Sequence, residues 1–137
     1  MDTEKESGGF LLDTDFLIDL NRGKGNKWRQ RASELLIAIN AQDLFISNIT
    51  VIEFITGIQQ DKQEQVQKML RQLYYYSVPT FNEALFAGQL RRQWLSRGYS
   101  LSIADVTNAA IAISRRLVLV TRNTQHYPFE HLAIRSW

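Results

Sequence analysis

The chain has 137 residues, 45% of them hydrophobic, a formal net charge of +2 and no cysteine. Its length suits one globular domain with one core, and the lack of cysteine excludes a disulfide framework and a thiolate zinc site. No window holds the roughly 18 apolar residues of a membrane span, and the polar start lacks the basic and apolar segments of a secretory signal. We therefore expect a cytoplasmic protein with no membrane partner.

The first half of the chain alternates short apolar runs with segments of helical periodicity. Residues 1–9 show no periodicity, which predicts a disordered lead. "FLLDT" is a continuous apolar run bounded by polar residues, as in a strand that is covered on both faces. The elements predicted next are a helix over 16–20, a helix over 27–41, a strand at 44–47, and a helix that begins at Thr50 and carries apolar residues to Ile58.

The second half continues the alternation and contains the clearest buried strand, "LVLVT" at 117–121. Its other predicted elements are helices over 61–76, 82–98 and 102–116, a strand at 75–79 and an edge strand within 131–137. Strands that alternate with helices predict an α/β fold. We expect a three-layer α/β/α sandwich around a central, mostly parallel sheet, formed by a single domain over residues 10–137.

Three isolated acids interrupt apolar surroundings near the predicted carboxyl edge of the sheet, where ligands bind in such folds. Asp13 ends the first predicted strand, and two further acids each follow a hydroxyl residue by three positions, in Thr50-x-x-Glu53 and Ser102-x-x-Asp105. Both patterns fit a capping box, in which the acid binds a free amide at the helix start. The alternative is that each acid lies in a first helical turn and faces the crevice, where the positive helix end keeps it ionised. Three such acids favour convergence on one site.

Four blocks in order carry a family resemblance: "LLDTDFLIDL", "ISNITVIEFITGI", "SIADVTNAAIAI" and "LVLVTRNTQHY". They resemble the signature blocks of the PIN-domain ribonucleases, and specifically of the VapC-type toxins of toxin–antitoxin systems, over nearly the whole chain from Phe10. In that family the acids of the first three blocks hold divalent metal, which corresponds here to Asp13, Glu53 and Asp105. The fourth block usually has Thr-x-Asp, whereas this chain has Asn123 in place of the acid. An amide oxygen can ligate a hard cation but lacks charge, so occupancy of a second metal position is left open.

Several neighbours of these acids are candidates for supporting contacts. Asp15, where the family commonly has asparagine, could add charge to the site or cap the helix that begins at Phe16. The preference of aspartate for helix starts favours the capping role. Thr14 has a hydroxyl that can orient a site carboxylate, and Asn108 shares the helix face of Asp105. The remaining candidates are Ser102 and Thr121.

The chemistry of the cluster indicates a cation and a reaction class. Clustered carboxylates repel one another and call for a bound cation, and oxygen ligands without histidine or cysteine suit magnesium or manganese rather than zinc. Such an ion can lower the pKa of an attacking water and neutralise charge on a phosphodiester. We therefore hypothesise hydrolysis of RNA without a covalent protein intermediate. Arg122 follows the last long strand and is the best candidate for an RNA contact, whereas the homodimer and the cognate antitoxin are implied by the resemblance.

Two other classes of function stay open. Asn123 in place of the fourth acid would fit a PIN-like protein that has lost its activity and serves as a binding partner. A receiver-type phospho-acceptor domain also has an acid pair after its first strand, but it needs a third aspartate after the middle strand and a lysine near the last strands. Neither "LFISN" nor "LVLVTRN" supplies one, which disfavours the receiver class.

Overall fold

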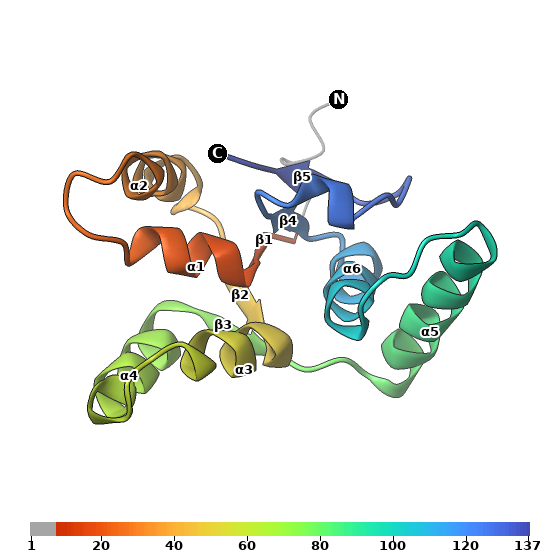
Figure 1. Cartoon of the computed structure of the whole chain (residues 1–137), viewed down its shortest axis with the longest axis horizontal. Helices are drawn as coiled ribbons and strands as arrows, with labels where there is room; N and C mark the ends of the chain where they lie inside the picture. The colour runs from red at the N-terminus through yellow and green to blue at the C-terminus, as the bar shows by residue number, and fades with distance from the viewer. Residues whose placement is uncertain (1–7) are drawn as a thin grey trace.

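The computed structural model describes residues 8–137, which form a central sheet with helices on both faces (Figure 1). Its strands are β1 (Phe10–Leu12), β2 (Leu44–Ser47), β3 (Tyr75–Ser77), β4 (Val118–Val120) and β5 (Ile134–Arg135). All pairings of the described strands are parallel, and their order is β3-β2-β1-β4-β5. The expected α/β fold is confirmed, with a sheet that is fully parallel over this part of the chain.

The strand order reverses at β1. The chain builds outward from β1 to β3 and then crosses back to place β4 on the other side of β1. In open parallel sheets, ligands bind beyond the carboxyl ends of the strands at such a reversal. Asp13 follows β1, Thr121 follows β4, and the Asp13 amide donates to the Val120 carbonyl at 2.9 Å. These two strand ends therefore mark the place to look for a site.

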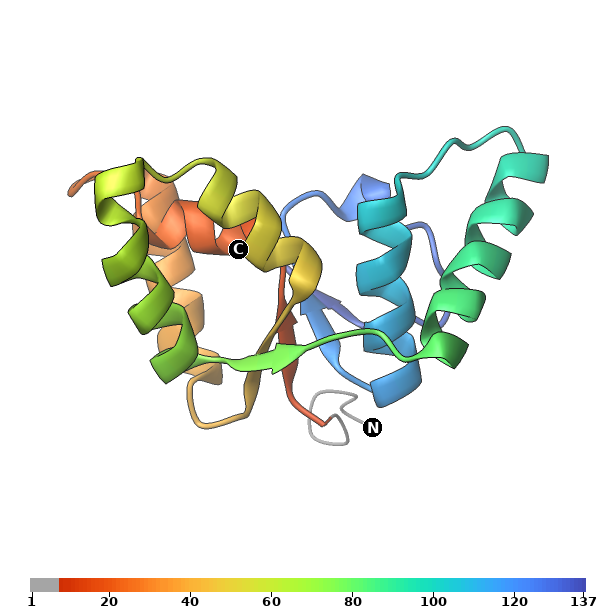
Figure 2. The same cartoon turned by 90° about the horizontal axis from the view of Figure 1, so that it is seen from below.

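The helices form two groups on opposite faces of the sheet (Figure 2). One face carries α1 (Thr14–Leu20), α2 (Lys27–Ile39), α3 (Asn48–Thr56) and α4 (Gln63–Leu73), and the other carries α5 (Phe81–Ser96) and α6 (Ile103–Arg115). Because side chains alternate along a strand, Leu12 packs into the core beneath α1 to α4, and Leu11 packs into the core beneath α5 and α6. This arrangement confirms the three layers. No helix of the described residues is long and apolar enough to cross a membrane.

The helix α3 begins earlier than its sequence pattern predicts. It starts at Asn48 directly after β2, and the Ser47 hydroxyl accepts the Thr50 amide at 3.4 Å, so Ser47 ends the strand and caps the helix. Thr50 is buried inside the first turn, where its hydroxyl donates to the Leu12 carbonyl at 3.2 Å. The predicted start at Thr50 is therefore wrong, and so is the capping box that would have occupied Glu53.

The helix α1 also begins earlier than predicted. It starts at Thr14, whose amide donates to Asp13 Oδ1 at 2.8 Å, which makes Asp13 the capping residue. Asp15 lies inside the first turn, so its expected role as the cap of a helix that begins at Phe16 is wrong. Asp13 is thus the single residue between the end of β1 at Leu12 and the start of α1 at Thr14.

The disordered lead expected over residues 1–9 lies outside the described residues except for Gly8 and Gly9. Gly9 is buried with a φ of +126°, and a Cβ atom there would lie 2.4 Å from the Asp43 carbonyl oxygen, a place only glycine fits. The Gly8 amide donates to the Arg116 carbonyl at 2.9 Å. These two residues therefore precede β1 in a defined position, bonded through their backbone to Arg116 and Val118.

Candidate active site

Asp13 and Asp105 approach the same hydroxyl group at the carboxyl edge of the sheet. The Tyr127 hydroxyl donates to Asp13 Oδ2 at 2.9 Å and lies 3.2 Å from Asp105 Oδ1. Asp13 comes from the end of β1 and is buried, whereas Asp105 comes from the first turn of α6 and is partly exposed. Residues that are 92 positions apart in the numbering thus meet through one side chain. Sequence reasoning did not select Tyr127, although it ends the fourth quoted block.

Asp105 is held at its backbone as well as at its side chain. The Ser102 hydroxyl caps α6 by accepting the Asp105 amide at 3.0 Å. The Asp105 carboxylate contacts Tyr127, and its Oδ2 lies 3.6 Å from His126 Nδ1. The alternatives for Asp105 were a capping box and a carboxylate that faces the crevice. The structure places Asp105 in the first turn of α6 with its carboxylate against Tyr127, as in the second alternative. Ser102 positions the helix start that carries it.

Glu53 reaches the same region from α3 through Thr14. The Thr14 hydroxyl donates to Glu53 Oε1 at 2.6 Å, so the residue next to Asp13 orients this carboxylate. Glu53 itself is exposed, and only Oε1 takes part in this bond. The sequence suggested that the Thr14 hydroxyl could orient a site carboxylate. The structure gives it that contact, with Glu53 as the acid.

Asp15 joins the acids to the end of β4. Its Oδ2 accepts hydrogen bonds from the Arg122 amide at 2.8 Å, from Thr121 Oγ1 at 3.2 Å and from Asn123 Nδ2 at 3.2 Å. Its other oxygen, Oδ1, is buried without a hydrogen-bond partner. Asp15 thus lies within the site, and it brings the amide of Asn123 next to the acids.

The electrostatics of the cluster disfavour bare carboxylates. Burial raises the pKa of Asp13, and the nearby Asp105 carboxylate adds to the effect. Burial and the charge of Asp13 raise the pKa of Asp15 to about 6. Among the described residues, neither Asp13 nor Asp15 forms an ion pair with a lysine or arginine side chain. Burial, followed by the charges of Asp13 and Asp105, raises the pKa of Tyr127, so its hydroxyl keeps its proton.

The donor set suits a hard cation, but it is not a closed cage. Its atoms are carboxylate, amide and hydroxyl oxygens, the ligands that magnesium and manganese prefer, and the orphaned Oδ1 of Asp15 adds a buried acceptor. Among the described residues, no group of three histidine, aspartate or glutamate side chains is arranged so that it could hold a metal ion. The Tyr127 hydroxyl contacts both Asp13 and Asp105, and the Thr14 hydroxyl binds Glu53. Movements of these side chains would be needed to gather the three acids around an ion.

The raised pKa of Asp15 predicts a pH dependence of stability. A carboxyl group whose folded pKa of about 6 exceeds its usual 3.8 favours folding at low pH, and this contribution is lost as the pH rises through 6. Between about pH 4 and about pH 7, the free energy of unfolding of the metal-free wild type should fall by roughly 1–3 kcal/mol relative to that of Asp15→Asn. Urea unfolding of both proteins across this range measures the difference. A constant difference would contradict the raised pKa.

Asn108 does not contact the acids, contrary to expectation. It is buried, and its Oδ1 accepts a hydrogen bond from the Ser47 hydroxyl. Ser47 in turn accepts the Thr50 amide at 3.4 Å. This buried chain of contacts ties α6 to the start of α3, and therefore fixes the two helices that carry Asp105 and Glu53.

The guanidinium of Arg122 is engaged within the protein. It lies 3.8 Å from the centroid of the Trp28 ring, its Nε lies 2.9 Å from Asp19 Oδ2, and its Nη2 donates to Asp19 Oδ1 at 3.3 Å. Asp19 is fully buried and also accepts from Arg22 at 2.6 Å and from Trp137 Nε1 at 2.9 Å. Arg122 therefore joins Asp19 to the Trp28 ring, and its expected contact with RNA stays a prediction. The signal in the sequence was Asp19 itself, an acid within the apolar run "FLIDL".

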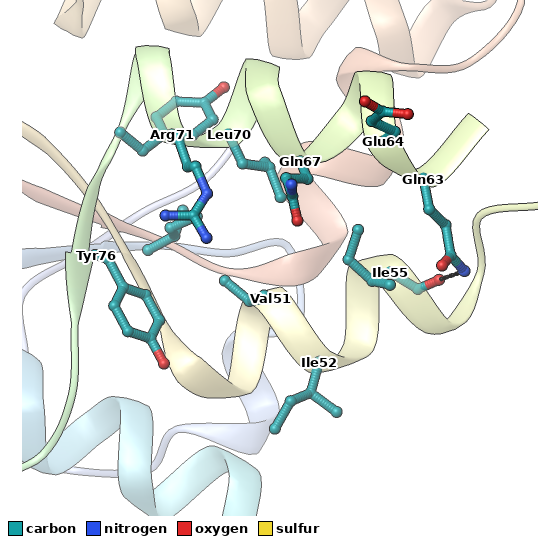
Figure 3. Close-up of a pocket in the computed structure, with 11 residues that line it drawn as sticks. Val51, Ile52, Ile55, Gln63, Glu64, Gln67, Leu70, Arg71 and Tyr76 are labelled. Carbon is teal, nitrogen blue, oxygen red and sulfur yellow. Dashed lines mark hydrogen bonds between the residues drawn. The ribbon is translucent and has the colours of Figure 1, made fainter. Parts of the chain in front are cut away.

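A separate groove of about 790 Å³ lies between α3 and α4 (Figure 3). Apolar side chains such as Val51, Ile55 and Leu70 line it together with polar ones such as Gln67 and Arg71. None of the acids described above lines this groove. Its surface is unlike the acid cluster, and we assign it no part in the chemistry.

Comparison with known proteins identifies relatives over nearly the whole chain. Residues 10–134 match the family model described as PIN domain. The curated protein Ribonuclease VapC1 of Methanocaldococcus jannaschii is 32% identical over 126 residues, which cover 90% of this chain and 82% of the relative.

Solved structures show the same fold. The DNA-bound VapBC of Salmonella typhimurium superposes with a TM-score of 0.76 at 25% identity and covers 94% of this chain and 98% of that chain. A toxin–antitoxin complex from Klebsiella pneumoniae gives a TM-score of 0.69 at 29% identity, covering 89% of this chain and 92% of that chain.

Proposed function

The chain belongs to the PIN-domain family, and we propose that it is a metal-dependent endoribonuclease that acts as the toxin of a toxin–antitoxin pair. The observation that carries this proposal is the approach of Asp13 and Asp105 to one hydroxyl group at the carboxyl edge of the sheet. A 32% identical relative that is named a ribonuclease supports the same reaction class. The receiver-type alternative has no such support, because the family match over residues 10–134 is to the PIN domain.

We assign the ion, Mg²⁺ or Mn²⁺, to Asp13, Asp105 and Glu53. When bound, it lowers the pKa of a water molecule and neutralises the negative charge that develops on the phosphodiester. The protein's own contribution is to orient these acids: Ser102 fixes the amide of Asp105 at 3.0 Å, and Thr14 holds one oxygen of Glu53 at 2.6 Å. A preoriented set of ligands spares the free energy of ordering them during the reaction.

The attacking group in this proposal is water rather than a protein side chain. Glu53 is exposed and uses Oε1 for Thr14, which leaves Oε2 to accept a hydrogen bond from that water. The side-chain amide nitrogen of Asn123 donates a hydrogen bond to Asp15. The amide oxygen of Asn123 is then left for a water or for the substrate. In-line attack by water does not use the ribose 2′-hydroxyl. The products should therefore carry no 2′,3′-cyclic phosphate.

We propose that exposed basic residues bind the RNA backbone, because Asp19 already engages the guanidinium of Arg122. Lys24 is exposed in the segment before α2. Lys27 and Arg31 are exposed in α2, where their charged groups lie 5.3 and 5.0 Å from the centroid of the Trp28 ring. Phosphate contacts of this kind supply affinity without reading the base sequence. Binding should accordingly weaken steeply with salt.

The partners proposed for the chain are a cognate antitoxin and a second copy of itself, in the cytoplasm. The similar structures from Salmonella typhimurium and Klebsiella pneumoniae are a DNA-bound VapBC and a toxin–antitoxin complex, which supports the first partner. An antitoxin that blocks the acids would offer a cation, since Asp13 and Asp15 have no lysine or arginine partner among the described residues.

Cleavage of structured RNA by the wild-type protein tests the proposal. We expect cleavage with Mg²⁺ or Mn²⁺, none after chelation, and recovery when the ion is restored. Cleavage that persists in the chelator would contradict the proposed metal dependence. Metal binding without any cleavage would instead favour the binding-protein alternative that Asn123 raises.

A further inference from the structure

Tyr127 combines a buried ring with a hydroxyl between two acids. Its exposed fraction is 3%, and its ring belongs to the core that α5 and α6 form with Leu11 and Leu119. It follows the short 3₁₀ turn η2 (Thr124–His126), whose chain is tied back by hydrogen bonds from His126 N to Asn123 O at 2.9 Å and from Tyr127 N to Thr124 O at 3.1 Å. The place of the hydroxyl is therefore set by core packing rather than by the acids.

One hydroxyl proton serves two carboxylate oxygens. The hydroxyl donates to Asp13 Oδ2 at 2.9 Å and keeps Asp105 Oδ1 within 3.2 Å, although a phenol has only one proton to donate. Two carboxylates of like charge would otherwise turn away from each other. A fixed hydroxyl between them can share its one proton with both oxygens in a three-centre hydrogen bond, so both acids stay directed toward one point.

We propose that Tyr127 is a positioning residue that holds Asp13 and Asp105 toward each other before a cation binds. This inference rests on the proposed function, because it concerns the affinity of the same acids for their ion. Groups that hydrogen-bond to metal-binding carboxylates commonly change metal affinity by about 10- to 100-fold when they are removed. The contact of Tyr127 with two acids at once places it in that class.

The variant Tyr127→Phe tests the inference, because it removes the oxygen and keeps the ring in the core. Calorimetric titration of the metal-free protein with Mn²⁺ should give a Kd about 10-fold weaker than that of the wild type. The Mn²⁺ concentration for half-maximal RNA cleavage should rise by a similar factor, while kcat at saturating Mn²⁺ stays within about threefold of the wild type. Tyr74→Phe is the matched control, since it removes a phenol oxygen from a half-buried tyrosine in the α3–α4 groove and should leave the Kd unchanged.

The outcomes separate this inference from the proposed function. A wild type that binds no Mn²⁺ overturns the proposed function, and the inference with it. A wild type that binds Mn²⁺ with an unchanged or tighter Kd in Tyr127→Phe overturns the inference alone, and a tighter Kd would mean that the hydroxyl competes with the ion. Circular dichroism checks that the variant is folded. Independently of any variant, paramagnetic Mn²⁺ should broaden the NMR signals of the wild-type Tyr127 ring before those of Tyr74. The reverse order would place the ion away from these acids and overturn the proposed function together with the inference.

Discussion

Asp105→Asn is expected to lower RNA cleavage by roughly 10²-fold or more, because it removes one negative charge from the pair that faces Tyr127. The amide keeps the shape of the side chain, and the bond from the Asp105 amide to Ser102 that caps α6 does not involve the carboxylate. The fold should therefore survive. Relief of the repulsion between Asp105 and Asp13 should even raise the melting temperature of the metal-free protein slightly. Cleavage rates at saturating Mg²⁺ and thermal unfolding without metal measure the two effects.

Asp61→Asn provides the matched control for Asp105→Asn. Asp61 is an exposed acid in the short turn η1 (Gln60–Lys62), and it takes no part in the contacts of the site. Its loss should leave cleavage within about twofold of the wild type. Equal activity in Asp105→Asn and the wild type would remove Asp105 from the mechanism, and an equal loss in both variants would show that the assay responds to charge in general.

Asp19→Ala is expected to destabilise the protein by about 3 kcal/mol, with little direct effect on the acids of the site. Asp19 is fully buried and accepts from Arg22, Arg122 and Trp137. Its removal leaves two guanidinium groups and an indole N–H without their acceptor. Breaking a buried ion pair costs about 3–5 kcal/mol, and the lower end applies because the side chains of Arg22 and Arg122 remain 39% and 28% exposed and can turn to water.

Urea unfolding of Asp19→Ala measures this loss, with Glu64→Ala as the control. Glu64 forms an ion pair with Lys68 at 3.6 Å, but both side chains are mostly exposed, so its removal should cost under about 0.5 kcal/mol. A loss of unfolding free energy below about 1 kcal/mol in Asp19→Ala would contradict the view that the contacts of Asp19 with Arg22, Arg122 and Trp137 join α1, α2 and the residues after β4.

The fold was accessible from the sequence because its core strands and helices differ in period. "LVLV" and "FLL" are short, wholly buried runs, and helical spacing is clear in α2 and α6. Helix starts were less accessible, since Ser47 ends β2 and caps α3 with no loop between them. The hydroxyl of Thr50 then resembled a cap, although it is an internal residue that bonds to the Leu12 carbonyl.

The site was accessible only in part, because side-chain direction depends on tertiary contacts. Asp13 and Asp105 could be placed at one edge from the strand and helix pattern. Tyr127 could not, since a single tyrosine after a loop has no period and its role depends on a packed ring. Arg122 follows a strand at this edge as predicted. Its guanidinium, however, binds the buried carboxylate of Asp19 rather than pointing into solvent.

A crystal of the protein soaked in Mn²⁺, with the ion located by its anomalous signal, tests the joint role of the acids most directly. We predict one strong peak within about 2.0–2.5 Å of carboxylate oxygens of both Asp13 and Asp105. A peak bound elsewhere, or acids that keep their contacts with Tyr127 while no ion enters at saturating Mn²⁺, would contradict a metal-dependent nuclease built on these residues.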